Sequence, residues 1–265
     1  AGTDAAFDPA VHRARPHPGQ GTTAANMARL LAGSAVRESH RDCGRVQDAY
    51  SLRCSPQVHG AVRDAFNHVR QVLEIEFNSA TDNPMVFPDG RVISGGNFHG
   101  APIAAVFDYL AVTITDLASI SERRFARMVD TSLSGLPRFL VDDAGVNSGF
   151  MMVQVSAAAL VSEMKTLSHP ASVDSIPTSA GQEDHVSMST WAARKLARVV
   201  DLGRRVLGME YLAAVQALEF HRPLTTSPEL ESVVSRLRER VPRLEEDRFL
   251  ADDMNAAADL IYELT

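Results

Sequence analysis

Three side chains that could do chemistry lie three residues apart in VQDAYSLRCSPQVHG, residues 46–60. They are Gln47, Tyr50 and Arg53. In a 3₁₀ turn, residues i and i+3 eclipse one another, so this spacing can place all three on one side. The Arg53 guanidinium is a planar fork that suits a carboxylate, and the Tyr50 phenol can donate, accept or transfer a proton. The stretch is therefore either one wall of a site or a polar connecting turn held by its own hydrogen bonds.

Two further irregular segments collect polar residues beside predicted helix starts. In ISGGNFHGAP (93–102), paired glycines permit close backbone approach, and Phe98 stands before Pro102, which fits the first turn of a helix. The segment HPASVDSIPTSAGQEDHVSM (169–188) connects two predicted helices and includes Glu183 near its end. Loops of this length are often functional, whereas acidic residues also suit a helix N-terminus. Phe98 is thus a site residue or an anchoring aromatic, and Glu183 a site carboxylate or a helix-start charge.

The elements that must position these side chains are predicted to be helices. Apolar residues recur three or four positions apart along most of the chain, which is typical of amphipathic helices. Helices are expected over residues 18–34, 55–80, 101–130, 148–168, 185–220, 227–241 and 251–264. Ser55 and Pro56 are expected as the N-cap and first residue of their helix. One β-hairpin is expected over residues 84–93, turning at Asp89-Gly90. The predicted fold class is all-α, a bundle of long helices with one small β-hairpin.

The composition narrows the function classes without choosing one. The chain has 265 residues, 45% of them hydrophobic and 22% charged, and a net charge of −7. This acidic balance argues against a nucleic-acid surface, and no run of about 18 apolar residues predicts a membrane span. Two cysteines, Cys43 and Cys54, do not make a disulfide scaffold, and we expect a cytoplasmic protein. No His-Glu-x-x-His and no cysteine pair at zinc spacing occurs, so no metal is expected. A hydrolase elbow and a phosphate loop are also absent. The spacing of residues alone is consistent with either a helical enzyme or a helical scaffold protein.

Segments in all three polar regions resemble histidine ammonia-lyase and its aromatic amino acid lyase and aminomutase relatives. They occur in the family's order between residues 15 and 188. The matching segments are RPHPGQ (15–20), SHRDCGRVQDAYSLRCSPQVHGAVRD (39–64), EFNSATDNPMVF (76–87), SGGNFHG (94–100), VNSGFM (146–151) and HPASVDSIPTSAGQEDHVSM (169–188). The resemblance implies a helical homotetramer whose active sites are shared between subunits. It also implies a reaction that removes ammonia from an α-amino acid and leaves an α,β-unsaturated acid.

The resemblance assigns roles to five residues. Arg53 would clamp the substrate carboxylate, and Tyr50 would lie beside the electrophile and the amino group, where its phenol assists proton transfer. Gln47 would hydrogen-bond in the same cluster. Phe98 would pack beside the electrophile and substrate, and Glu183 would face the substrate ring. The catalytic residues implied are Tyr50 and Glu183.

The carboxylate at position 183 indicates the substrate. In the phenylalanine and tyrosine lyases, the position that resembles Glu183 is a glutamine. A carboxylate suits an imidazole N–H better than a bare phenyl ring. L-Histidine, eliminated to urocanate, is therefore the expected substrate. However, NFHG (97–100) resembles the phenylalanine, tyrosine and aminomutase branch. An aromatic amino acid lyase, a 2,3-aminomutase, and a non-catalytic helical assembly module stay open as alternatives.

The family's electrophile is a methylidene-imidazolone (MIO) cyclised from an internal Ala-Ser-Gly, and this chain contains no Ala-Ser-Gly. We expect that tripeptide, and the tyrosine usually assigned as β-proton base, to belong to an N-terminal half. Residues 1–265 would then be one helical C-terminal portion of the lyase fold, through a cut, a split polypeptide or an isolated fragment. The expected partners are the amino acid substrate, the N-terminal half and further copies of the chain. Alone, the chain is expected to be inactive.

Overall fold

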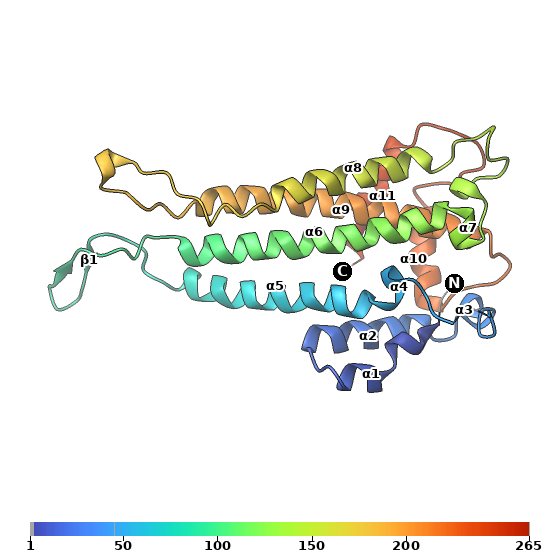
Figure 1. The fold of residues 1–265 in the computed structure, drawn as a ribbon, viewed down its shortest axis with the longest axis horizontal. Coiled ribbons are helices and arrows are strands. Elements are labelled where there is room, and N and C mark those ends of the chain that lie inside the picture. Colours follow the sequence, from blue (N-terminus) through green and yellow to red (C-terminus); the bar gives the residue numbers. More distant parts are fainter. Residues whose placement is uncertain (1–2, 45, 265) are drawn as a thin grey trace.

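The long amphipathic segments form the body of the fold. The computed structural model describes residues 3–44 and 46–264. Helices α5 (Ser55–Phe77), α6 (Ala101–Val129), α8 (Met151–Leu167) and α9 (Ser189–Glu219) run along the long axis of the molecule (Figure 1). Helix α6 is central and packs against α5, α8 and α9. The all-α bundle predicted from the apolar periodicity is confirmed.

Shorter elements gather at one end of these helices, shown at the right of Figure 1. Helix α2 packs against α5, and α11 packs against α9. The shorter elements are η1 (Asp4–Phe7), α1 (Pro9–Arg13), α2 (Pro18–Leu31), α3 (Ala35–Glu38), α4 (Tyr50–Arg53), α7 (Thr131–Ser134), η2 (Arg138–Leu140), η3 (Ser179–Gly181), α10 (Pro228–Arg238) and α11 (Ala251–Glu263). Only η3 lies away from this end, in the loop between α8 and α9.

The predicted β-hairpin is present at the opposite tip of the molecule (Figure 1). Strand β1 (Met85–Val86) pairs antiparallel with β2 (Val92–Ile93). Gly90 has a φ of +83°, a left-handed conformation that a glycine adopts without steric cost. The hairpin extends beyond the helices and is mostly exposed, so it contributes little to the core.

The main apolar core lies where α6, α8, α9 and α11 meet. Phe125, Phe150, Leu212 and Leu260 are all buried in it. Helix α6 is long and apolar enough to cross a membrane by length and composition alone. Helices α5, α8 and α9 pack against it, and its buried residues include two acidic side chains, Asp108 and Glu122.

One local prediction is wrong. Ser55 is not the N-cap of α5 but its first residue, and Cys54 precedes it as the cap. The reason is that the short helix α4 ends at Arg53 and leads directly into α5. The Ser55 hydroxyl therefore donates back to the carbonyl oxygen of Ser51, at 3.0 Å, instead of accepting a bond from the new helix. This bond ties α4 to the start of α5.

Candidate active site

Tyr50 and Arg53 lie on one turn of α-helix, α4, and not on the 3₁₀ turn that the spacing suggested. The Cys54 amide donates to the Tyr50 carbonyl at 2.9 Å, the i to i−4 bond of an α-helix. The Arg53 guanidinium lies over the Tyr50 ring, 4.6 Å from the ring centroid, so these two side chains do share one side. Gln47 lies before the helix and is exposed.

The Arg53 side chain carries unused hydrogen-bonding capacity. Its Nε is buried and has no hydrogen-bond partner within residues 3–44 and 46–264, and the same is true of Ser51 Oγ and Gln57 Oε1. Buried polar atoms in native proteins are nearly always paired, so these three atoms can take a further hydrogen-bond partner. A cavity of about 520 Å³ opens beside Arg53 and has Leu52 and Arg127 among its lining residues. In contrast, the Tyr50 side chain is 71% exposed.

A partly buried ion pair lies next to α4, because Arg124 Nη1 is 3.5 Å from the carbonyl oxygen of Ser51. Arg124 on α6 pairs with Glu210 on α9 through its Nε and Nη2, and the Nη2 bond measures 2.7 Å. Ser121 donates to the same carboxylate at 2.5 Å. The remaining Arg124 nitrogen, Nη1, donates to His59 Nε2 at 3.3 Å. Because His59 accepts this bond, its ring must be neutral.

The electrostatics of His59 agree with that assignment. Burial away from water, together with the positive charges of Arg124 and Arg63, lowers the pKa of His59 to about 4. Its ordinary value is 6.5. The imidazole is thus an acceptor for Arg124 at neutral pH and cannot serve as an acid there.

This lowered pKa predicts a loss of stability in mild acid. Between pH 6.5 and 4 the unfolded chain binds a proton at this histidine and the folded chain does not, so the free energy of unfolding falls as the pH falls through this window. We expect His59 to account for about 2 kcal/mol of lost stability between pH 7.5 and 5. Urea unfolding at the two pH values measures it.

The control is His59→Gln, which keeps an acceptor for Arg124 but does not titrate. Its unfolding free energy should depend on pH less than that of the native chain by about 2 kcal/mol over the same interval. An equal pH dependence in the two proteins would show that His59 titrates normally in the folded state.

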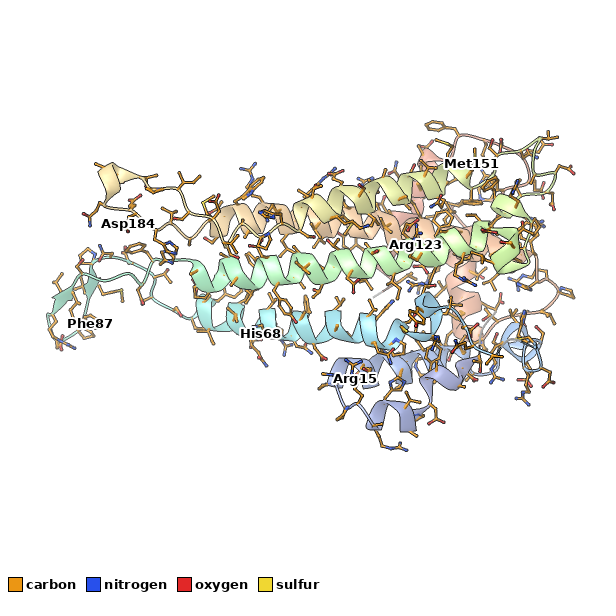
Figure 2. The ribbon with its side chains drawn as sticks, viewed as in Figure 1. Arg15, His68, Phe87, Arg123, Met151 and Asp184 are labelled. Carbon is orange, nitrogen blue, oxygen red and sulfur yellow. The ribbon has the colours of Figure 1, made fainter. Side chains whose placement is uncertain are left out.

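Phe98 and Glu183 lie at the other end of the bundle. Phe98 is in the turn before α6 and is 58% exposed. The exposed Glu183 carboxylate accepts a hydrogen bond from the Thr178 hydroxyl across the tip of the loop. The two segments meet through histidines: the rings of His99 and His185 stack at 5.6 Å between centroids, and His99 Nε2 donates to the His185 carbonyl at 3.1 Å. Figure 2 shows the neighbouring Asp184 at this tip.

The structure therefore divides the five predicted residues into two groups. Gln47, Tyr50 and Arg53 lie in or just before α4, at the start of α5. The segment before α6, which carries Phe98, and the loop between α8 and α9, which carries Glu183, lie beyond the far end of α5 (Figure 1). Helix α5 has 23 residues and spans about 35 Å. One substrate cannot touch both groups of the same chain. A site that uses all five must combine groups from different copies.

The ion pairs next to both groups were not predicted from the sequence. Arg124 and Glu210 lie beneath α4, and Asp108 and Lys195 lie beneath the loop that carries Glu183. The available signal was a charged residue inside an apolar helical stripe, as in APIAAVFDYLAV (101–112). That pattern marks a buried charge but not its partner, which in both pairs is more than 80 residues away.

Comparisons with known proteins agree on one family. The family model described as aromatic amino acid lyase matches residues 1–239. Histidine ammonia-lyase from Koribacter versatilis is 57% identical over 98% of this chain, and the match covers 53% of that protein. The crystal structure of histidine ammonia-lyase from Trypanosoma cruzi is 45% identical with a TM-score of 0.90, covering 99% of this chain and 49% of that one. Tyrosine aminomutase from Streptomyces globisporus is 40% identical with a TM-score of 0.92, covering 99% and 54%. The chain spans about half the length of these relatives.

Proposed function

Because the chain belongs to the aromatic amino acid lyase family, we propose that it is the C-terminal part of an ammonia-lyase that converts L-histidine to urocanate and ammonia. The observation that carries the proposal is the state of Arg53, which stacks on Tyr50 and keeps a buried nitrogen without a partner in the described part of the chain. An arginine in this state can receive a carboxylate with little rearrangement. The high identity to histidine ammonia-lyases supports the choice of reaction.

Gln47, Tyr50 and Arg53 would bind the amino and carboxylate groups of the substrate. The Arg53 fork can hold both carboxylate oxygens, which fixes the orientation of Cα and Cβ. The Tyr50 phenol lies beside the guanidinium and can hold or pass a proton at the substrate amino group. Gln47 can add an amide hydrogen bond from the segment before α4. The elimination itself breaks the Cα–N bond and removes a Cβ proton, so ammonia leaves as the double bond forms.

An N-terminal half would supply what this chain lacks. The methylidene-imidazolone of the family would provide an electrophile that makes the amino group a better leaving group. No Ala-Ser-Gly is present to form it, so we propose that it comes from the other half. The cavity beside Arg53 supports this, as do the Ser51, Arg53 and Gln57 atoms that have no hydrogen-bond partner among the described residues, because they leave room and bonding capacity for another segment.

Glu183 would recognise the substrate ring from another copy of the chain. Its carboxylate is exposed at the loop tip, and it can accept the N–H of an imidazole. Phe98 is exposed at the same end and would pack beside the substrate. We propose a homotetramer in which this end of one copy meets the α4 end of another. Exposed apolar side chains along the bundle support association, among them Phe66, Ile75 and Met152.

We further propose a cytoplasmic location. Cys43 and Cys54 are both free thiols in the described residues, which suits a reducing compartment.

Product analysis tests the reaction. The assembled enzyme, meaning this chain together with an N-terminal half that carries Ala-Ser-Gly, is incubated with histidine, phenylalanine or tyrosine, and products are identified by NMR. We expect urocanate and ammonia in equal amounts from histidine, and much less product from the other two. A β-amino acid as the main product would instead identify an aminomutase. Unsaturated acids formed mainly from phenylalanine or tyrosine would identify an aromatic lyase.

A further inference from the structure

A buried ion pair lies beneath the start of the loop that carries Glu183. Lys195 Nζ on α9 is 3.1 Å from Asp108 Oδ1 on α6, and each side chain is only 5% exposed. The two helices pack together along their length, which fixes the pair between them. An isolated buried charge is costly, so each of these residues needs the other to remain charged.

Both charges also bind the backbone of the loop. The Ser172 amide donates to Asp108 Oδ2 at 2.7 Å, and Lys195 donates to the carbonyl oxygen of His169. Hydrogen bonds from Ser172 and the charge of Lys195 outweigh the effect of burial and lower the pKa of Asp108. The carboxylate is therefore ionised at neutral pH. The pair thus holds two backbone groups three residues apart, which fixes the direction in which the chain leaves α8.

Neighbouring contacts complete this attachment. The hydroxyls of Ser168 and Thr115 are hydrogen-bonded at 2.6 Å, joining the end of α8 to α6. Ala171 is buried against Ala104 and Ala192. All these contacts lie at the base of the loop, within residues 168–172.

The outer part of the loop has much weaker support. Residues 177–185 are exposed, and Glu183 bonds to Thr178, which belongs to the same tip. The amide of Val186 donates to Ser175 Oγ at 2.8 Å, which closes the loop on itself. Apart from the His99–His185 contact, these bonds hold the tip together without attaching it to the helices. The direction of the tip therefore depends on the loop's attachments at residues 168–172 and at His185.

We propose that Asp108 and Lys195 are positioning residues that anchor residues 169–188 to the bundle so that Glu183 reaches the ring of the substrate. This inference rests on the proposed function for the role of Glu183. The anchor itself is independent of the reaction. Neither residue lies at the exposed tip, so both would act through the loop and not by touching substrate.

The test uses three variants of the full chain and one control. Lys195→Met and Asp108→Asn each leave one buried charge unpaired, so these proteins are at risk of not folding. The double variant Asp108→Asn/Lys195→Met removes both charges, retains an amide oxygen for Ser172, and loses the bond to His169. Lys165→Met is the control, because Lys165 is the chain's other lysine and is exposed on α8.

Hydrogen exchange followed by mass spectrometry measures how firmly residues 169–188 are attached to the bundle. In the double variant we expect amides of residues 169–188 to exchange at least about tenfold faster, with exchange in α6 and α9 unchanged. We expect its melting temperature to stay within about 3 °C of the native value. The fluorescence of Trp191, the single tryptophan, should shift because it lies at the start of α9 beside Ala192. Lys165→Met should leave the exchange of this loop and the fluorescence unchanged.

Measurements of KM and kcat on the assembled enzyme test whether the attachment positions Glu183 for the substrate. Loss of a ring contact that substrate and transition state share should raise KM for histidine about tenfold, with kcat changed less than about threefold. A general folding defect would lower kcat in proportion to the inactive fraction and leave KM unchanged. The split between KM and kcat therefore separates the two explanations.

Each contrary result has a distinct meaning. Native exchange rates at residues 169–188 in the folded double variant would refute the anchor. Faster loop exchange with unchanged KM would refute the positioning role. If the native assembly does not convert histidine at all, the proposed function fails, while the exchange data still decide whether Asp108 and Lys195 anchor the loop.

Discussion

Replacing Arg53 by methionine should lower kcat/KM for histidine about a hundredfold or more in the assembled enzyme. The substrate carboxylate would lose two charge-assisted hydrogen bonds, which together are worth about 3 kcal/mol or more. That free energy corresponds to about a hundredfold in rate. The change should cost little stability, because Arg53 Nε has no hydrogen-bond partner among the described residues and the Tyr50 contact is largely exposed.

Two further variants make the Arg53 result specific. Arg53→Lys keeps the positive charge but not the planar fork, so its loss of kcat/KM should be smaller than that of Arg53→Met. Arg70→Gln is the matched control, because Arg70 lies on α5 and its side chain is 65% exposed. Its kcat/KM should equal that of the native enzyme. Full activity of Arg53→Met in the assembled enzyme would contradict the catalytic interpretation of this chain and favour a non-catalytic assembly module.

Replacing Gly60 by alanine should destabilise the fold by about 3 kcal/mol. Helices α2 and α5 approach so closely at this residue that a Cβ on Gly60 would lie 2.4 Å from the Gln20 nitrogen and 2.5 Å from its Cα. These are backbone atoms of α2, so the clash cannot be relieved by rotating a side chain. The helices must separate, which also disturbs the bond of 2.8 Å from the Gly19 amide to Asp64.

Gly21→Ala provides the matched control for this prediction. Gly21 also lies in α2, but a Cβ there would meet no atom within 4 Å. Alanine in this helix should raise stability by about 0.5–1 kcal/mol, because it restricts the unfolded chain. Urea unfolding at pH 7.5 measures both variants. A Gly60→Ala protein as stable as the native chain would show that α2 and α5 are not in contact at this point.

The parts of the fold that follow from local sequence were predictable. Apolar spacing located the long helices because each α-helix buries one face, and Asp89-Gly90 located the hairpin turn because Gly90 adopts a positive φ. Tyr50 and Arg53 were placed on one side because they belong to the same helical turn. Each of these inferences uses residues only a few positions apart.

Tertiary relations could not be obtained in the same way. Nothing local indicates that Phe98 and Glu183 lie beyond the far end of α5 from Arg53, since their separation depends on the length and direction of this helix of about 35 Å. Asp108 and Lys195 come together because α6 and α9 pack, and their sequences carry no mark of the pairing. The wrong N-cap at Ser55 has a related cause, because α4 supplies the carbonyl to which its hydroxyl binds.

Complementation tests the central claim most directly. The purified 265-residue chain, an N-terminal half carrying Ala-Ser-Gly, and the mixture of the two are each incubated with histidine while urocanate and ammonia are measured. We predict no product from the 265-residue chain or from the N-terminal half alone, and equal amounts of urocanate and ammonia from the mixture. Conversion of histidine by the 265-residue chain with no other polypeptide present, or no conversion by the assembled mixture, would contradict the account.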